Sequence, residues 1–325
     1  MYKDTLFTLT NEMDFEREAL LRFEKLMSQH DLYSKFVHSL FGTSFSPTSW
    51  REIPCVPVSF FKDHNLYRAE ASPQAVFTSS GTTGSITSKH PVEKLSWYHE
   101  VSKTCFERIY GNLQEWNFLC LLPSYLEREG SSLIEMCRYF IELSGKGGFF
   151  LTDHNALLEQ LRISRANGQK TMLIGVSFAL LDLAESFPDK ELFKDVVVME
   201  TGGMKGRRKE ITRMELHDRL KTAFGIDQIA SEYGMTELMS QAYAPTNAMF
   251  IPPSWMRLYT RHPSDPLSVQ KDGSVGLLNI LDLANTSSLP FIAVDDIGKV
   301  YDSGQFEIFG RYDRSDIRGC NLMVI

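Results

Sequence analysis

Residues 78–85 read Thr78-Ser79-Ser80-Gly81-Thr82-Thr83-Gly84-Ser85, and the interpretation of the rest of the chain depends on this stretch. Glycine lets a backbone turn tightly and approach a ligand, while successive N–H groups and hydroxyls supply the donors that a phosphate oxygen needs. A flexible linker has a similar composition, and the stretch alone does not choose between the two. The Gly-Lys-Ser/Thr ending of the common nucleotide-binding loop is absent, so a phosphate site here belongs to a different fold.

The composition is that of an ordinary globular protein. With 325 residues, 43% of them hydrophobic, the chain is long enough for about two domains and a substantial core. Its net charge of -7 argues against a nucleic-acid partner. No apolar run reaches the roughly 20 residues of a membrane span, and the N-terminus does not resemble a secretion signal, so we expect a cytoplasmic protein. Scattered cysteines without metal-ligand spacing are expected to be free thiols: Cys55, Cys105, Cys120, Cys137 and Cys320.

The periodicity of apolar residues predicts an α/β fold. Spacings of three and four predict helices over residues 12–41, with a break near His30-Asp31, and over 92–110, 132–143, 157–166 and 212–224. Short apolar runs predict strands at 118–122, 148–151, 171–176 and 196–199. Because continuous apolar strands alternate with helices, we expect a parallel sheet that is covered on both faces and binds ligands at the carboxyl ends of its strands.

Polar loops that follow two of these strands are candidate ligand sites. Residues 200–209 contain the paired Gly202 and Gly203, which permit close approach of a ligand, and then a cationic cluster; the alternative is a solvated basic helix start. Residues 231–237 contain a planar ring, a hydroxyl and a carboxylate suited to Mg²⁺; the alternative is a helix cap. A third loop, residues 123–127, is expected to be a turn.

The residue pattern of the chain changes beyond residue 244. Prolines interrupt it, and short β-rich runs at 277–281, 291–294 and 305–309 predict a small β subdomain. Between two apolar runs lies the pair Asp295-Asp296, which is either a turn or a site that accepts hydrogen bonds from ribose hydroxyls. The expected organisation is a helical segment with an extended connection over 1–72, an α/β core over 73–244 and the β subdomain over 245–325.

Four motifs in order give a resemblance to a known family. The segments FTSSGTTGS (77–85), SEYGMTEL (231–238), AVDDIGKV (293–300) and GRYDRSD (310–316) resemble the motif series of the acyl-adenylating enzymes. Within that superfamily, four further segments are similar to the LuxE family of long-chain acyl-protein synthetases: PSYLEREGSSL (123–133), ETGGMKGRRKEITR (200–213), SEYGMTELMSQAY (231–243) and DIRGCNL (316–322). The resemblance covers almost the whole chain.

The resemblance implies a fold and an activity. The fold is the N-terminal domain of an acyl-adenylating enzyme, with parallel sheets covered by helices and a small β subdomain, lacking the usual large C-terminal domain. The activity is ATP- and Mg²⁺-dependent conversion of a fatty or related carboxylic acid to acyl-AMP and pyrophosphate. Such a step is catalysed mainly by positioning and by neutralising phosphate charge.

The resemblance also assigns roles to single residues around the phosphates. Thr236 would contact the α-phosphate, Glu237 would bind Mg²⁺ and Arg311 would approach the nucleotide from the last motif. The β- and γ-phosphates would be held by Ser79, Ser80, Gly81, Thr82, Thr83 and Gly84.

The nucleoside would lie between two of the polar segments. Gly202 and Gly203 would line the adenine pocket, and Tyr233 would stack on the adenine. Asp296 would take the ribose hydroxyls, which agrees with the second interpretation of the acidic pair.

A cysteine near the end of LuxE-family chains accepts the acyl group as a thioester, and Cys320 matches that place. Arg314 and Arg318 would favour its thiolate, although a cysteine packed at a strand edge is the alternative. The acyl group would then pass to a partner such as an acyl-accepting reductase or a carrier protein. Two other hypotheses are a ligase that delivers acyl-AMP to a carrier protein or another nucleophile, and a non-catalytic module that binds a nucleotide or acyl-AMP.

Overall fold

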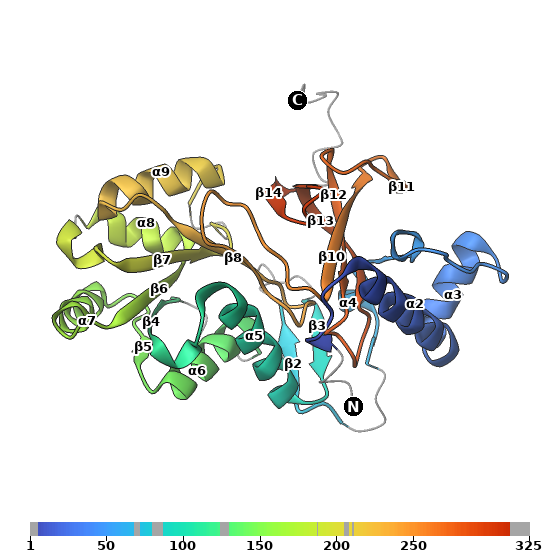
Figure 1. Cartoon of the computed structure of the whole chain (residues 1–325), viewed down its shortest axis with the longest axis horizontal. Helices are drawn as coiled ribbons and strands as arrows, with labels where there is room; N and C mark the ends of the chain where they lie inside the picture. The colour runs from blue at the N-terminus through green and yellow to red at the C-terminus, as the bar shows by residue number, and fades with distance from the viewer. Residues whose placement is uncertain are drawn as a thin grey trace.

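Among the residues that it describes, the computed structural model contains two six-stranded sheets and a short two-stranded hairpin (Figure 1). The described residues are 6–67, 72–79, 87–123, 130–186, 188–204, 208–209 and 211–312. A continuous core of buried aliphatic and aromatic side chains includes Phe118 from one six-stranded sheet and Ile292 from the other. The two sheets are therefore packed into one body by apolar burial.

The parallel sheet predicted from the alternation of strands and helices is confirmed. Its strand order is β5-β4-β6-β7-β8-β9. The strands are β4 (Trp116–Leu121), β5 (Gly147–Phe149), β6 (Lys170–Val176), β7 (Val196–Thr201), β8 (Ala230–Tyr233) and β9 (Ala242–Ala244). All pairs of neighbours are parallel except β8 with β9. Every residue of β4 is buried, which explains why this strand reads as a continuous apolar run.

Helices cover both faces of the parallel sheet. They are α5 (Leu95–Tyr110), α6 (Ser132–Ser144), α7 (His154–Ala166), α8 (Ser177–Glu185) and α9 (Arg213–Phe224). In Figure 1, α8 and α9 lie on one side of the sheet, and α5 and α6 lie on the other. The predicted helices are confirmed, and α6 shows why: the hydroxyl of Ser131 accepts a hydrogen bond from the N–H of Ile134, and Gly145 ends the helix at φ 65°. The sequence did not predict α8, because seven of its nine residues are buried and leave no polar face.

The second six-stranded sheet contains the predicted β subdomain. Its order is β1-β13-β12-β10-β11, and β14 pairs with β13. The strands are β1 (Val56–Pro57), β10 (Met256–His262), β11 (Asp265–Val269), β12 (Val275–Asp282), β13 (Phe291–Val300) and β14 (Phe306–Arg311). The three predicted β-rich runs lie in β12, β13 and β14. The turn expected as one alternative for Asp295-Asp296 is wrong, because β13 continues through both residues.

The N-terminal part of the chain packs against this second sheet. Helices α2 (Glu12–Gln29) and α3 (Asp31–Phe41) are separated at His30, as predicted, and β1 pairs in parallel with β13 through Val56 and Ile292. The short helices are α4 (Phe60–Asp63), η1 (Trp50–Glu52), η2 (Leu113–Glu115) and η3 (Lys190–Phe193). Among the described helices, none has the length and apolar character that crossing a membrane requires. The division of the chain at residues 72 and 244 stays a prediction.

The hairpin consists of β2 (Ala75–Thr78) and β3 (Lys89–Val92), which pair antiparallel with Thr78 opposite Lys89. Figure 1 shows it between the parallel sheet and the second sheet. The Gly/Thr-rich stretch 78–85 begins at the end of β2, and residues 80–86 lie outside the described part of the chain. The hairpin therefore brings residues 78–79 and 87–88, which flank residues 80–86, to the junction of the two sheets.

Candidate functional site

Two predicted loops leave the carboxyl edge of the parallel sheet side by side. Thr201 at the end of β7 is in register with Glu232 on β8, so Gly202 and Tyr233 occupy neighbouring positions just beyond that pair. Gly202 has a left-handed φ of 68°, which favours glycine. Gly203 is exposed, and no described heavy atom lies within 4 Å of the place where a Cβ would be. The backbone at Gly203 is therefore open, in the loop that follows the strand next to Tyr233.

Three of the predicted site residues meet at this edge. The hydroxyl of Tyr233 donates a 2.7 Å hydrogen bond to Asp296 Oδ2, and Arg311 Nε lies 4.0 Å from Asp296 Oδ1. Asp296 and Arg311 are cross-strand partners on β13 and β14. Phe250 and Phe306 hold the Tyr233 ring edge-on, with ring centroids 5.9 Å and 5.6 Å away. The second sheet thus supplies a carboxylate and a cation to a tyrosine of the first.

The electrostatics of this group are dominated by burial. Burial raises the pKa of Asp296, although the hydrogen bond from Tyr233 and the charge of Arg311 act in the opposite direction. Burial and the neighbouring Asp296 also raise the pKa of Tyr233 well above its ordinary value. Tyr233 therefore stays a neutral donor to Asp296.

Thr236 and Glu237 lie in a turn that follows β8 and leads to β9. No helix begins in the described residues 234–241, so the alternative that these two residues cap a helix is wrong. Asp282 fixes the continuation of this turn, because its carboxylate accepts hydrogen bonds from the backbone N–H groups of Met239 and Ser240, both at 2.9 Å. A buried carboxylate at the end of β12 therefore holds the turn against the second sheet.

The carboxyl of Glu237 fits a role as a cation ligand. Its side chain is buried, and no Lys or Arg forms an ion pair with it among the described residues. Burial raises its pKa, while a hydrogen bond with the side chain of Ser88 lowers it. The described residues contain no group of three His, Cys, Asp or Glu side chains that could hold a metal alone. Mg²⁺ needs no such group when substrate phosphates and water complete its coordination.

The neck of the predicted phosphate loop is closed by a pair of serines. The N–H of Ser79 donates to the carbonyl of Ser88 at 3.1 Å, and the N–H of Ser88 donates to Ser79 Oγ at 2.9 Å. Of the six residues expected to hold the β- and γ-phosphates, only Ser79 is among the described residues. Ser80, Gly81, Thr82, Thr83 and Gly84 lie outside them, so their role stays a prediction.

His90 is a residue of this site that the sequence interpretation missed. It is fully buried on β3, and its Nδ1 lies 2.8 Å from the carbonyl oxygen of Thr236. Burial lowers its pKa to about 4 against the opposing effect of that carbonyl. A single histidine in a short strand carries no motif, so no pattern in the sequence could have indicated this contact.

Other charged residues near the site have structural partners. Arg213 Nε lies 2.8 Å from Glu200 Oε1, and Glu200 is buried beneath the predicted adenine loop. In the cationic cluster that follows the glycines, Arg208 bonds instead to Asp182 and Glu185 of α8. Among the described residues, Arg208 therefore forms surface ion pairs with two carboxylates of α8. The helix-start alternative for this loop is also wrong at residues 208–209, since α9 begins later at Arg213.

The free thiols predicted for Cys55, Cys105, Cys120 and Cys137 are confirmed. Burial raises the pKa of Cys55 to about 12, which makes it a poor nucleophile at neutral pH. Cys320 and the flanking Arg314 and Arg318 lie outside the described residues.

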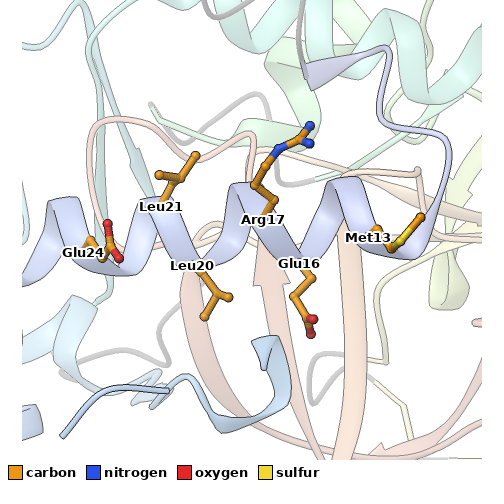
Figure 2. A pocket seen from close by; sticks show the side chains of 6 residues that line it. All are labelled: Met13, Glu16, Arg17, Leu20, Leu21 and Glu24. Carbon is orange, nitrogen blue, oxygen red and sulfur yellow. The ribbon is translucent and has the colours of Figure 1, made fainter. Parts of the chain in front are cut away.

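A shallow hollow on the surface lies apart from these residues. Figure 2 shows that its lining side chains all come from helix α2. They are Met13, Glu16, Arg17, Leu20, Leu21 and Glu24. Because no residue of the site lines this hollow and one helix cannot enclose a ligand, it does not compete with the junction of the sheets as the candidate site.

The chain is similar to proteins of one family and of one fold. The family described as "Acyl-protein synthetase, LuxE" matches residues 137–325, which is more than half of the chain. The long-chain-fatty-acid–luciferin-component ligase of Aliivibrio fischeri is 25% identical over 299 residues, covering 83% of this chain and 77% of the relative. The family match confirms the resemblance stated from the motifs.

Three solved structures illustrate the similarity in fold. ATP-bound MatB from Rhodopseudomonas palustris has a TM-score of 0.56 at 15% identity, covering 77% of this chain and 49% of its own. The o-succinylbenzoate-CoA synthetase MenE from Bacillus subtilis gives 0.54 at 15%, covering 76% and 50%. A malonyl-CoA ligase with methylmalonyl-CoA and AMP gives 0.51 at 18%, covering 80% and 55%. The chain spans about half the length of these structures, and the similarity over that part confirms the expected α/β fold.

Proposed function

The chain belongs to the LuxE family of acyl-protein synthetases and is a ligase, and we propose that it activates a fatty acid with ATP and transfers the acyl group to a protein thiol. The observation that carries the proposal is the convergence of Tyr233, Asp296 and Arg311 beside the Thr236-Glu237 turn. A ring, an acceptor and a cation at the carboxyl edge of a parallel sheet are the groups that a nucleotide requires.

In the proposed first step, a carboxylate oxygen of the acid attacks the α-phosphorus of ATP. The bond from that phosphorus to the oxygen bridging the β-phosphate breaks, pyrophosphate leaves and acyl-AMP forms. Tyr233 would stack on the adenine beside Gly202 and Gly203, and Asp296 would accept hydrogen bonds from the ribose. These contacts would hold the reacting oxygen and phosphorus in line, which is the main source of rate acceleration in such a step.

The phosphates would meet a second group of residues. Thr236 would donate to the α-phosphate, and Arg311 would neutralise part of the charge from the edge of β14. Residues 79–84 would hold the β- and γ-phosphates through backbone N–H groups and hydroxyls. Mg²⁺, held by Glu237 together with the phosphates, would neutralise charge on the oxygens of the leaving pyrophosphate.

In the proposed second step, the thiolate of Cys320 attacks the acyl carbonyl. The bond between that carbon and the AMP oxygen breaks, AMP leaves and a thioester forms. The support for Cys320 is its position in the sequence together with family membership. A fatty acid is the proposed substrate because the Aliivibrio fischeri relative is a long-chain-fatty-acid ligase. An acyl-accepting reductase or a carrier protein is the proposed final acceptor.

Acid-dependent ATP–pyrophosphate exchange tests the first step. We expect exchange with one or more members of a series of saturated fatty acids, abolished in Glu237→Gln and retained in the control Glu159→Gln, whose carboxylate is exposed on α7. Tight ATP binding without exchange for any acid in a broad panel would contradict the proposal and favour a non-catalytic nucleotide-binding module.

Labelling with radioactive fatty acid and ATP tests the second step. The wild-type chain should become labelled, and neutral hydroxylamine should release the label because it cleaves thioesters. Cys320→Ser should remain unlabelled, while the control Cys55→Ser should be labelled like the wild type. If Cys320→Ser still transferred the acyl group to a partner to the same extent as the wild type, and the wild type itself carried no label, Cys320 would not be the acceptor.

A further inference from the structure

We propose that Ser88 and His90 are positioning residues that hold the phosphate loop in register with the Thr236-Glu237 turn. The proposal rests on the function proposed above and adds two residues to the adenylating site: Ser88, which directly precedes β3, and His90 of β3. Neither residue belongs to the motifs that indicated the family. Their role follows from where the hairpin places them.

The first observation is that the hairpin presents alternate residues to the turn. Ser88 and His90 are both buried, whereas Lys89 between them is exposed. Successive side chains of a strand point to opposite faces, so Ser88 and His90 share the inner face. That face meets the turn: the Nδ1 of His90 lies 2.8 Å from the carbonyl oxygen of Thr236. The side chain of Ser88 is close enough to Glu237 to lower the pKa of that carboxyl.

The second observation is the direction of the histidine contact. A carbonyl oxygen can only accept, so the Nδ1 of His90 carries the proton and donates across 2.8 Å to Thr236. The ring is fully buried and packs edge-on against Phe61, with centroids 5.5 Å apart. Because the ring is fixed on β3, its hydrogen bond determines where the Thr236 peptide lies.

The third observation connects Ser88 to the phosphate loop itself. Ser88 exchanges two hydrogen bonds with Ser79 at the neck of the loop, through its own carbonyl and its own N–H. The same residue therefore bonds the loop neck through its backbone, and its side chain lowers the pKa of the metal-ligand candidate Glu237. A shift of the hairpin would move the β- and γ-phosphates relative to Glu237 and Thr236, and misplacement on the scale of 1 Å lowers rates by up to about 100-fold.

Substitutions at His90 separate this role from packing. Phe in place of His90 keeps a ring of similar shape but removes the donor. In Asn the amide nitrogen is attached to Cγ, as Nδ1 is in histidine, so His90→Asn retains a donor. The matched control is His30→Phe, because His30 is also a buried histidine that contacts backbone groups, through Leu66 and Tyr33, but in the N-terminal helices.

The measurements are kcat and KM for ATP in pyrophosphate exchange, together with the rise in Tm caused by Mg-ATP. We expect His90→Phe to lower kcat/KM about 10- to 100-fold and to reduce the ATP-induced rise in Tm, with His90→Asn recovering most of both. His30→Phe should lower Tm while leaving kcat/KM per folded molecule unchanged. Ser88→Ala removes only a hydroxyl and should raise the Mg²⁺ concentration that gives half-maximal exchange. This variant tests the proposal if His90→Phe does not fold.

The outcomes distinguish this inference from the function on which it rests. Unchanged exchange in both His90→Phe and Ser88→Ala would overturn the positioning role, as would equal losses in His90→Phe and His90→Asn that follow Tm. If the wild type binds ATP but exchanges with no acid, the proposed function fails. In that case the inference would still be supported if His90→Phe lost the ATP-induced rise in Tm and His90→Asn recovered it. A wild type that binds no ATP would overturn both.

Discussion

The hydroxyl of Tyr233 donates a 2.7 Å hydrogen bond to the carboxylate of Asp296, which lies 63 residues further along the chain. Tyr233 is the last residue of β8 in the parallel sheet, and Asp296 lies within β13 of the second sheet. This contact joins the parallel sheet, from which the predicted adenine-binding loop extends, to the strand that carries Asp296, the residue predicted to bind the ribose. The relative position of the two sheets therefore determines the geometry of the nucleoside site.

Removing that hydroxyl should weaken nucleotide binding without unfolding the protein. Tyr233→Phe keeps the ring and its packing against Phe250 and Phe306 but leaves Asp296 without its donor. We expect the KM for ATP in pyrophosphate exchange to rise about 3- to 10-fold, since one hydrogen bond to a charged group contributes about 1 kcal/mol or more. Tyr301→Phe is the control, because Tyr301 bonds to Glu307 at the far end of β13. Equal KM values for the two variants would contradict the role of Tyr233.

A buried ion pair beneath the adenine loop should be essential for stability. Burial raises the pKa of Glu200, but Arg213 and His217 outweigh it and hold this pKa below its ordinary value, so the carboxylate is charged. Arg213→Met would leave that charge buried without its partner, and we expect the free energy of unfolding to fall by about 3 to 5 kcal/mol.

The same helix offers the control for this prediction. Arg219 pairs with Glu215 on the exposed face of α9, so Arg219→Met should cost less than about 1 kcal/mol. Urea unfolding at pH 7 measures both variants. Similar small losses in the two would mean that Glu200 finds another compensating donor when Arg213 is absent.

The elements that the sequence predicted are those specified by local signals. Helix α6 begins after the capping Ser131 and ends at Gly145, and β4 is apolar throughout, so both are readable within a short window. Strand β10 was not predicted, because Arg261 interrupts its apolar pattern. That arginine is buried and donates to the Val294 carbonyl at 2.7 Å, a partner that only the folded sheet supplies.

The same distinction applies to the site. Motifs predicted Tyr233, Asp296 and Arg311, and the fold brings these three together. His90 could not be predicted, because its function depends on a backbone carbonyl 146 residues away. Arg208 pairs with Glu185 of α8, and this could not be predicted, because a charge pattern does not reveal which carboxylates the fold places beside an arginine.

Glu232 should make stability depend on pH near neutrality. It lies on β8 and accepts a hydrogen bond from Thr201, and burial raises its pKa from 4.5 to about 7 despite that bond. The folded protein therefore binds a proton that the unfolded chain releases between about pH 4.5 and 7. This proton stabilises the folded protein to its full extent below about pH 4.5. The stabilisation is lost as the pH rises through about 7.

Glu232→Gln should remove this dependence. Between pH 5 and pH 8 we expect the stability of the variant relative to the wild type to improve by about 2 to 3 kcal/mol, measured by urea unfolding at several pH values. Glu159→Gln, at an exposed carboxylate, should follow the wild type across the same range. A stability difference for Glu232→Gln that stayed constant with pH would show that the carboxyl titrates normally in the folded protein.

The paired glycines should respond differently to alanine, because their backbones differ. Gly202 has φ 68°, so Gly202→Ala should lower the free energy of unfolding by about 1 kcal/mol or more. Gly203 has open space where a Cβ would lie, so Gly203→Ala should leave stability unchanged or raise it by a few tenths of a kcal/mol.

If adenine occupies the open space at Gly203, the added methyl of Gly203→Ala should raise the KM for ATP about 10-fold with little change in kcat, since it would obstruct binding equally in the ground and transition states. Gly148→Ala is the matched control, because Gly148 lies on β5 at the far edge of the parallel sheet and its Cβ would make only ordinary contacts of 3.9 Å with Phe150. Exchange kinetics and Tm of the three variants test this, and a KM for Gly203→Ala equal to that of Gly148→Ala would mean that the adenine lies elsewhere.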